Sequence, residues 1–183
     1  MDVFEAVQAR RSIREFEETA VPREKLERVL EAGRLAPSAR NSEPWHFIVV
    51  TDEVKKKVLS HGRFAKFVAH APVVIVACGD HEASPDWYAI DVALAVENMV
   101  LTAVNEGLST CIVGSFEEKE IHSALGLPDN FEVLILLPIG YSNGKVDLSS
   151  KMLNLVRSRK TLTDVTSQEC FGQKFVPQKV LNP

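Results

Sequence analysis

The sequence predicts an α+β protein in which helices and a small number of strands alternate along a chain of 183 residues. Segments with the apolar period of helices alternate with short β-branched runs that are typical of strands. Two runs, "VVIVAC" at 73–78 and "FEVLILLPIGY" at 131–141, are almost entirely apolar, which indicates strands buried on both faces. The segment 84–107 predicts the longest helix. It is apolar nearly all round, so it must be central or shared with another subunit.

The N-terminal part of the chain predicts two helices, a loop and a strand. Asp2 can cap a first helix, which ends near the segment "ARRS". Residues 21–36 predict a second helix, because an apolar stripe stands opposite a charged face. Two prolines and small polar residues at 37–44 break that pattern and predict a loop, and residues 45–51 predict a strand.

The remaining core elements follow from the same signals. They are a capped helix at 52–62, a short helical segment at 64–72, the strand at 73–78, the long helix, a short strand and turn at 108–116, a helix at 117–128 and the strand at 131–141. The polar segment 79–88 is interpreted as a loop in which Ser84 or Asp86 caps the long helix. The alternative is that this loop faces a substrate.

The last forty residues have a different sequence pattern from the rest of the chain. From residue 142 the sequence is mixed and weakly periodic, which predicts an extended arm with one short helix near 163–167. We expect a single domain, 1–183, of which about 142–183 form this arm. Because the arm cannot bury its own apolar residues, we expect a dimer in which it lies on the partner subunit.

Composition narrows the possible partners and the compartment. The net charge of −4 gives no overall field that would favour nucleic acid or anionic lipid. The three cysteines are odd in number and form no CxxC pair, and the histidines form no HxxxH pair, so neither a disulfide framework nor a metal site is expected. The N-terminus is too charged for a signal peptide, and no apolar run approaches the roughly 20 residues of a membrane span. These features predict a cytoplasmic protein.

Two basic clusters stand out against this acidic average. They are "RRSIR" at 10–14 and "VRSRK" at 156–160. Arginine is always charged and binds phosphate through two nitrogen atoms at once, so a phosphate site is one interpretation of such a cluster. The alternative for the first cluster is a solvated basic end that complements the C-terminus of the first helix.

The loop at 37–44 carries a second candidate site. Pro37 and Pro44 stiffen it, while Ser38, Asn41 and Ser42 offer hydrogen-bonding groups. Those groups suit the edge of a heteroaromatic ring or a ribityl chain. The alternative is a plain helix-to-strand connection whose polar residues cap neighbouring ends.

"RRSIREF", a helix, and then "APSARNSEPWHFIVV" resemble, in order and spacing, the nitroreductase family of FMN-dependent enzymes. Downstream, "DVALAVENMVLTAVNEGLSTCIVGSF" resembles the family's central dimer helix and flavin-edge loop. "LGLPDNFEVLILLPIGY" resembles its last core strand, and "RSRKTLTDV" its closing basic segment. The resemblance extends to about residue 172. It implies an α+β sandwich in which helices flank a mixed, mainly antiparallel sheet, and a homodimer with FMN at the subunit interface.

The resemblance also implies which residues bind the flavin. They are Arg10, Arg11 and Ser12 with Arg157 and Arg159 at the phosphate, Arg14 at the pyrimidine edge, Pro37, Ser38, Ala39 and Asn41 from the other subunit, and Ile112, Val113 and Gly114 along the ring. The Gly114 N–H would point at flavin N5, and a cation at the pyrimidine edge would stabilise the negative charge of reduction. No side chain is expected to act as a catalytic acid or base.

The function implied is an FMN oxidoreductase. It would take hydride from NAD(P)H onto flavin N5 and pass it to a second small molecule, of nitroaromatic or quinone type, by a ping-pong mechanism. One alternative is a biosynthetic or dehalogenating flavoenzyme of the same family. Others are a flavin sensor or carrier without turnover, and a phosphate-binding or nucleotide-binding module without flavin. No nucleic-acid or membrane partner is expected.

Three residues depart from the family's usual pattern. Glu43 stands where glutamine is common, Ser109 where glycine is frequent and Thr161 where proline is frequent. The extra carboxylate of Glu43 would either repel anionic substrates or pair with an arginine. The chain also lacks the longer insertions that build a substrate lid in larger members, which leaves the substrate open.

Overall fold

The computed structural model describes residues 1–144 and 159–176. The chain divides into two compact units, Met1–Lys145 and Val146–Pro183. The first unit contains the whole sheet and the helices that cover it. Within its described residues, the second unit contains one short helix.

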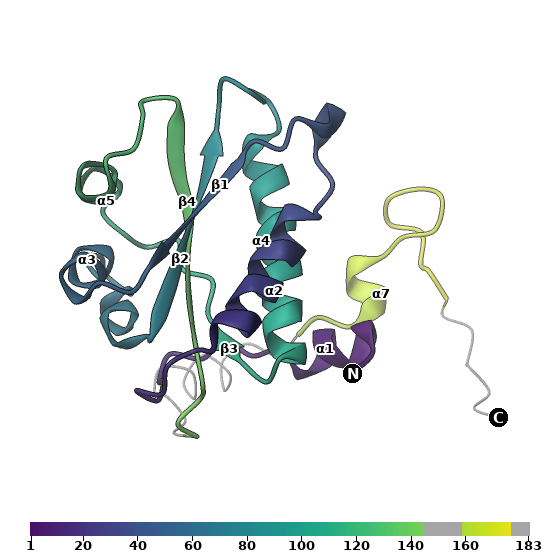
Figure 1. Ribbon diagram of the computed structural model, residues 1–183. Coiled ribbons are helices and arrows are strands. Elements are labelled where there is room, and N and C mark those ends of the chain that lie inside the picture. The colour runs from purple at the N-terminus through teal and green to yellow at the C-terminus, as the bar shows by residue number, and fades with distance from the viewer. Residues whose placement is uncertain (145–158, 177–183) are drawn as a thin grey trace. The chain divides into compact units, whose positions relative to one another are not determined.

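A four-stranded antiparallel sheet forms the centre of the first unit (Figure 1). Its strands are, in spatial order, β1 (Trp45–Val50), β2 (Val73–Asp80), β4 (Phe131–Gly140) and β3 (Ser109–Thr110). Every pair of neighbouring strands is antiparallel, so the predicted α+β class is confirmed. Among the described residues, the parallel pairing expected of a mixed sheet is reduced to an isolated bridge between Ser12 and Thr110.

β2 is buried on both faces, as its sequence predicts. Alternate side chains enter two apolar clusters: Val74, Val76 and Cys78 enter one, and Val73, Ile75 and Ala77 enter the other. Successive side chains of a strand point to opposite faces, so one continuous apolar run supplies both clusters. Full burial of a valine or isoleucine side chain contributes about 1.5–3 kcal/mol, which makes this strand a large part of the core energy.

Helices cover both faces of the sheet. α2 (Arg23–Arg34) and α4 (Tyr88–Asn105) lie on one side, and α3 (Glu53–Leu59) and α5 (Glu118–Leu125) lie on the other (Figure 1). The helical segment predicted at 64–72 is a short 3-10 turn on the second side. Two layers of helices around one sheet leave the ends of the strands and their connecting loops as the places where polar residues can gather.

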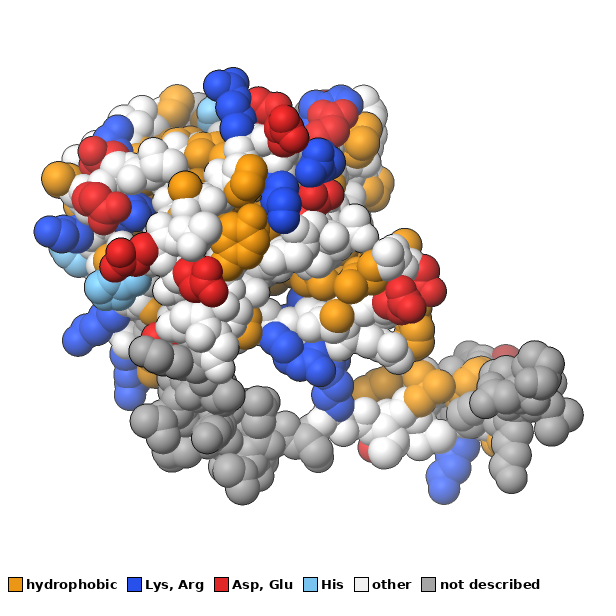
Figure 2. All heavy atoms as spheres, turned by 60° about the horizontal axis from the view of Figure 1, so that its bottom comes forward, with side chains coloured by type: hydrophobic (Ala, Val, Ile, Leu, Met, Phe, Trp, Pro, Cys, Tyr) orange, Lys and Arg blue, Asp and Glu red, His pale blue; other side chains and the backbone are white. Residues whose placement is uncertain are grey.

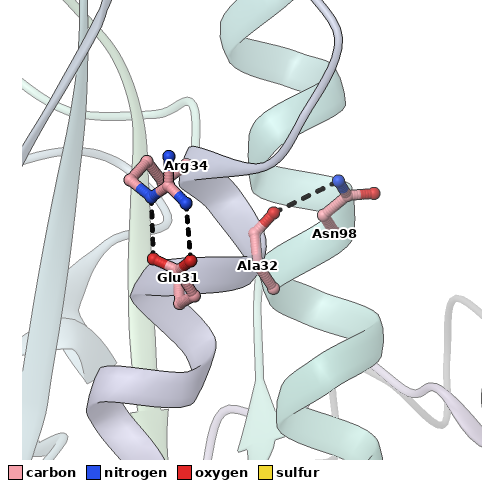
Figure 3. A network of polar contacts seen from close by, with 4 residues as sticks. All are labelled: Glu31, Ala32, Arg34 and Asn98. Atoms are coloured by element: carbon pink, nitrogen blue, oxygen red, sulfur yellow. Dashed lines mark hydrogen bonds and ion pairs between the residues drawn. The ribbon is translucent and has the colours of Figure 1, made fainter.

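α2 and α4 pack closely because Gly33 has no side chain. A Cβ atom built there would lie 2.1 Å from the Cε atom of Met99. At the adjacent residues, the side-chain amide of Asn98 donates to the carbonyl oxygen of Ala32 at 3.2 Å (Figure 3). These contacts fix α4, and with it the loops at both of its ends.

α4 has the length and apolar composition of a membrane span, with a mean hydropathy of 1.2 over its 18 residues. This differs from the sequence-based expectation that no apolar run approaches such a length. The helix packs against α2 and the sheet through a buried face that includes Val92, Val96 and Met99. Core burial of that face accounts for its composition.

The start of α4 differs from the prediction. Neither Ser84 nor Asp86 caps the helix through its side chain, since Trp87 is the N-cap residue and makes no side-chain cap bond. Ser84 contributes through its backbone instead, and its carbonyl oxygen accepts from Tyr88 N–H at 2.9 Å. A buried serine whose carbonyl starts the helix leaves no role for a hydroxyl cap.

α1 (Val3–Ala9) begins at the predicted cap. Asp2 accepts a hydrogen bond from the N–H of Glu5 at 2.8 Å, and the Glu5 carboxylate accepts from the N–H of Asp2 at 2.9 Å. This reciprocal pair is a capping box, which satisfies two N–H groups that a helix start would otherwise leave free. α1 ends at Ala9, and its C-cap residue, Arg10, is the first residue of the first basic cluster.

In the second unit, α7 (Leu162–Val165) confirms the short helix predicted near 163–167. Thr161 and Asp164 form a second capping box at its start. A bridge between Ser167 and Lys174 then closes a compact loop. The described part of the arm is therefore more structured than its weak periodicity indicates.

Candidate functional site

The first basic cluster lies alongside the predicted flavin-edge loop. The N–H of Ile13 donates to the carbonyl oxygen of Thr110 at 2.9 Å, and Ser12 bridges the same residue. Thr110 is the last residue of β3 and is buried, so it holds the basic segment at a fixed point of the sheet. The backbone thus brings together residues 10–14 and 112–114, two of the groups that the sequence predicts for one site.

Two arginines of this cluster, Arg11 and Arg14, have different surroundings. The guanidinium of Arg11 donates to the carbonyl oxygens of Gln8 and Arg10, at 2.6 and 2.8 Å. It therefore complements the C-terminus of α1, which is the alternative interpretation of the cluster. Arg14 is half-buried, with its guanidinium 6.0 Å from the ring centroid of Phe67, so its cation is held in place by an aromatic face.

The turn after β3 offers open space beside a glycine. Val113 is tied to β4 by two backbone hydrogen bonds with Leu136, at 2.9 and 3.0 Å. A Cβ atom built at Gly114 would meet no atom within 4 Å. Among the described residues, no acceptor meets the Gly114 N–H. Ile112, which is 47% exposed, lies on the same turn. A flat ligand could therefore approach the backbone here and accept a hydrogen bond from it.

The structure adds a segment that the sequence analysis missed, residues 61–67. The N–H of Phe64 donates to the hydroxyl of Ser115 at 3.4 Å, and the N–H of Glu117 donates to the carbonyl of His61 at 3.0 Å. A Cβ atom at Gly62 would lie 2.3 Å from the carbonyl oxygen of Ser115, so only glycine permits this approach. The segment therefore forms a wall beside the turn at 112–115. Gly62, three residues after the end of α3, is the signal that could have indicated it.

This wall carries an exposed cation and an exposed ring. The guanidinium of Arg63 lies 5.2 Å from the ring centroid of Phe64, and Phe64 is 68% exposed. In Figure 2, basic and acidic side chains are interspersed over the surface, with apolar side chains exposed between them. The combination of a cation and a ring next to the open space at Gly114 suits a planar ligand.

The loop at 37–44 is held by bonds among its own residues. The hydroxyl of Ser38 accepts from the N–H of Glu43 at 3.0 Å, and the side-chain amide of Asn41 donates to the carboxylate of Glu43 at 3.0 Å. Arg40, Asn41 and Glu43 have φ angles of 56°, 54° and 45°, which side chains other than glycine rarely adopt. The Glu43 carboxylate therefore accepts a hydrogen bond from Asn41, and its charge also interacts with that of Arg34.

One polar atom of this loop has no partner within the described residues. The hydroxyl oxygen of Ser42 is buried and makes no hydrogen bond there. A buried hydroxyl without a partner costs free energy, so Ser42 adds to the strain of this loop. The neighbouring Pro44 accepts from Asp80 N–H at 2.7 Å through its carbonyl, which joins the end of the loop to β2.

A second missed residue is Asp91, in the first turn of α4. Its carboxylate oxygens both lie 3.2 Å from the backbone nitrogen of Ala39, and the residue is only 3% exposed. The sequence signal was a carboxylate among apolar residues near the start of the longest helix. A charged residue in that position is rarely buried without a hydrogen-bonding role.

The structure does not assemble all predicted site residues in one place. Within residues 1–144, no hydrogen bond or ion pair joins the loop at 37–41 to residues 10–14 or 112–114. Arg159 belongs to the second unit and is exposed. Arg157 lies outside the described residues. The pairing of the two basic clusters around one phosphate stays a prediction.

The buried thiol of Cys78 is not a candidate nucleophile. Burial raises its pKa to about 12, so it stays protonated at neutral pH. It lies on β2 within the apolar cluster beneath α3 and α5. Its role is packing.

The residues near Gly114 fit a flavin. The turn at 112–114 offers open space and an N–H donor, Arg14 supplies a cation, and Ser12 supplies a hydroxyl on the adjoining segment. These are the groups that tune a flavin ring: a backbone donor at the reactive edge and a positive charge at the edge that becomes negative.

Comparisons with known proteins point to the same family. A family model described as the nitroreductase family matches residues 7–63 and 61–141. A protein of Archaeoglobus fulgidus named as an NADH dehydrogenase/NAD(P)H nitroreductase is 33% identical over 154 residues, covering 80% of this chain and 88% of that protein. Iodotyrosine deiodinase 1 of Mus musculus is 25% identical over 194 residues, covering 85% of this chain and 68% of that protein.

Solved structures share the fold. A protein of Parabacteroides distasonis, named as an NADH dehydrogenase/NAD(P)H nitroreductase, superimposes with a TM-score of 0.82 at 26% identity, covering 92% of this chain and 98% of that one. An FMN-dependent nitroreductase of Clostridium difficile superimposes with a TM-score of 0.73 at 29% identity, covering 86% and 99%. The family match spans most of the first unit, including the basic segment, the strained loop and the turn at Gly114. On these grounds the chain belongs to the nitroreductase family.

Proposed function

We propose that this protein is an FMN-dependent oxidoreductase that takes hydride from NAD(P)H and reduces a second small molecule. Family membership and the solved FMN-dependent relative support the cofactor. The observation that carries the proposal is the open space at Gly114, whose N–H has no acceptor among the described residues, next to a segment that bears Ser12 and Arg14. When bound there, FMN supplies the hydride-accepting atom N5.

Each protein group has a distinct task in this proposal. The Gly114 N–H would donate to the reactive edge of the ring, and Arg14 would stabilise the negative charge that reduction brings to the flavin. The contact of Arg14 with Phe67 keeps that cation in place. Arg10, Arg11 and Ser12 would bind the phosphate, and the family resemblance assigns Arg157 and Arg159 of the arm to the same group. Arg11 would then give up its bonds to the end of α1.

We further propose that the protein works as a homodimer. Apolar side chains are exposed on α1, where Val3, Phe4 and Val7 are 75%, 67% and 46% accessible, and on α4, where Ile90 and Leu94 are 51% and 44% accessible. Between α1, α2 and α4 lies a groove of about 460 Å³ that Leu35 and Leu101 help to line. A second copy of the chain would cover this apolar surface and bring its loop at 37–41 to the flavin.

The same site would serve two substrates in turn. NAD(P)H would bind over the turn at 112–114, give up hydride and leave, and a nitroaromatic or quinone would then take its place. The wall at 61–67, with Arg63 and Phe64, is the side of the site that meets either molecule. This order predicts ping-pong kinetics. We place the protein in the cytoplasm as a soluble enzyme.

Reductive dehalogenation is a second candidate. The observation in its favour is the match to iodotyrosine deiodinase 1 over most of this chain. The chain covers about two thirds of that relative, and it lacks the longer insertions expected to form a lid. Anaerobic assays with a halotyrosine and with a nitroaromatic, under the same donor, distinguish the two reactions.

The first experiment is an anaerobic visible spectrum of the purified protein, before and after NADH and then NADPH. Flavin bands that disappear on addition establish reduction by a nicotinamide and identify the preferred donor. Bands that persist indicate a sensor or another donor. A colourless protein that takes up no added FMN contradicts the proposal. Initial rates over both substrates then test the order of binding: parallel double-reciprocal lines support the ping-pong scheme, and intersecting lines exclude it.

A further inference from the structure

Asp91 is a buried carboxylate that joins two parts of the chain. It lies in the first turn of α4, is 3% exposed, and places both carboxylate oxygens 3.2 Å from the N–H of Ala39. Transfer of a carboxylate from water to the protein interior costs much free energy unless hydrogen bonds or an opposite charge compensate it. Its position at the positive end of a helix dipole lowers that cost. An alanine or valine at this position would pack in the core without the cost of burying a charge. The carboxylate therefore has a role beyond packing.

Asp91 bonds to a strained loop, residues 37–43. Arg40, Asn41 and Glu43 have positive φ angles, and such residues persist only where the surroundings determine them. The bonds of Ser38 with Glu43 and of Asn41 with Glu43 lie within the loop and set its local shape. They do not fix its position relative to the sheet. The bond from Ala39 to Asp91 ties this part of the loop to a core helix.

We propose that Asp91 is a positioning residue: it holds the loop at 37–43 in its ligand-binding shape and ties that loop to α4. This rests on the proposed function, in which the loop contacts FMN. α4 also carries Ile90 and Leu94 of the proposed dimer surface. Asp91 therefore connects two parts of the proposed dimer. One is α4, which would face the second subunit, and the other is the loop at 37–43, which would reach the flavin of that subunit.

The tie to α4 can be tested without any cofactor assay. Arg40 is exposed within the loop, so trypsin cuts the chain after it whenever the loop opens. Asp91→Ala removes the acceptor and is expected to raise the rate of this cut about tenfold, the size of one lost hydrogen bond to a charged group. Asp91→Asn keeps one acceptor oxygen but loses the charge, so it is expected to raise the rate of this cut only a few-fold.

Two controls make this result specific. Asp86→Ala removes an exposed carboxylate five residues earlier and is expected to leave the cut after Arg40 unchanged. Cleavage after arginines outside the loop, such as Arg34 of α2, reports general loosening of the fold. A wild-type rate of cleavage after Arg40 in Asp91→Ala overturns the proposal. So does an equal rise at Arg34, because the loop would then not be the part that Asp91 holds.

The link to the flavin is tested by the dissociation constant for FMN, from quenching of flavin fluorescence. Asp91→Ala is expected to raise it about tenfold, and Asp91→Asn to restore most of the affinity. Unchanged affinity in an Asp91→Ala protein that trypsin cuts faster overturns the ligand-binding part of the inference. If wild-type protein binds no FMN, the proposed function fails, while the proteolysis still decides whether Asp91 holds the loop.

If Asp91→Ala does not fold, Asp91→Asn provides a milder test. Amide hydrogen exchange of wild type and Asp91→Asn follows the peptide that contains Ala39. A neutral acceptor bonds more weakly than a carboxylate, so exchange in that peptide is expected to accelerate several-fold while the core strands stay unchanged. Equal exchange in the two proteins overturns the proposal.

Discussion

The backbone N–H of Ile13 lies 2.9 Å from the carbonyl oxygen of Thr110 and donates a hydrogen bond to it. This bond places the basic segment beside the strand that leads to Gly114. Neither apolar period nor composition predicts such a contact, because it joins backbone groups that are far apart in the sequence. It is the relationship on which the candidate site depends.

Gly114→Ala is expected to weaken FMN binding at least tenfold without changing the thermal stability of the flavin-free protein. A Cβ atom at this position meets no protein atom within 4 Å, so the fold tolerates it. The added methyl group would occupy the space proposed for the ring, and close approach of the backbone to the ligand would be lost. Fluorescence titration with FMN and a melting curve measure the two effects. Unchanged affinity would place the flavin elsewhere.

Gly33→Ala is the matched substitution in the core and should have the opposite pattern. Its Cβ atom would lie 2.1 Å from Met99 Cε, so α2 and α4 must shift or Met99 must change rotamer. Overpacking of this kind costs about 1–3 kcal/mol of unfolding free energy. Urea unfolding followed by circular dichroism measures it. Since Met99 is a flexible side chain, a cost near zero would show that it moves aside freely.

Arg10→Ala and Arg159→Ala should each weaken FMN binding by about 1.5–3 kcal/mol, the size of a lost charge-assisted hydrogen bond to phosphate. Arg23→Ala is the control, because Arg23 is an exposed residue of α2 paired with Glu27. Riboflavin, which has no phosphate, should bind wild type and variants alike. Equal retention of FMN in Arg10→Ala and Arg159→Ala would exclude a phosphate held between the two basic clusters.

The sequence predicted the fold well because its strongest signals are local. "VVIVAC" supplies both apolar clusters from one strand, and Gly126 ends α5 in the left-handed conformation where the pattern stops. Asp2 caps α1 as expected. Such features depend on neighbouring residues, so period and capping rules reveal them.

The site was predicted less completely because its contacts join distant segments. The approach of residues 61–67 to Ser115 and the bond between Asp91 and Ala39 leave no periodic trace in the sequence. Phe4 illustrates the same limit: it is apolar and lies in a helix, yet it is exposed in the structure. The positions of Arg10 and Gly114 came from the family resemblance, which carries information on tertiary structure.

Protonation of the Asp80 carboxylate in acid should lower the free energy of unfolding of the protein. The N–H of Ala83, the side chain of Asn130 and the N–H of Glu82 bond its carboxylate and lower its pKa below the ordinary value. A carboxylate with a lowered pKa stabilises the fold above its unfolded pKa, near 4, and this contribution is lost as the pH falls through the folded pKa. Asp80→Asn should therefore lose less stability than wild type between pH 7 and pH 3, measured by urea unfolding. Equal losses would assign the acid sensitivity to other groups.

Leu94→Glu should separate the proposed dimer and lower FMN affinity with it. Leu94 is 44% exposed on α4, next to Ile90, and a carboxylate there would be buried without a partner if a second copy covered this face. In the isolated subunit the same side chain would point into water at little cost. Val54→Glu, at a side chain that is 71% exposed on α3, adds the same charge on the opposite side of the sheet and should leave the dimer intact.

Light scattering coupled to size-exclusion chromatography gives the mass of both variants, and the absorbance of the eluted peak gives the flavin retained. If the loop at 37–41 reaches the flavin of the other subunit, mass and flavin content must fall together in Leu94→Glu. A monomer that keeps its full complement of FMN would show that one subunit builds the whole site. A Leu94→Glu protein that stays dimeric would move the interface away from this face of α4.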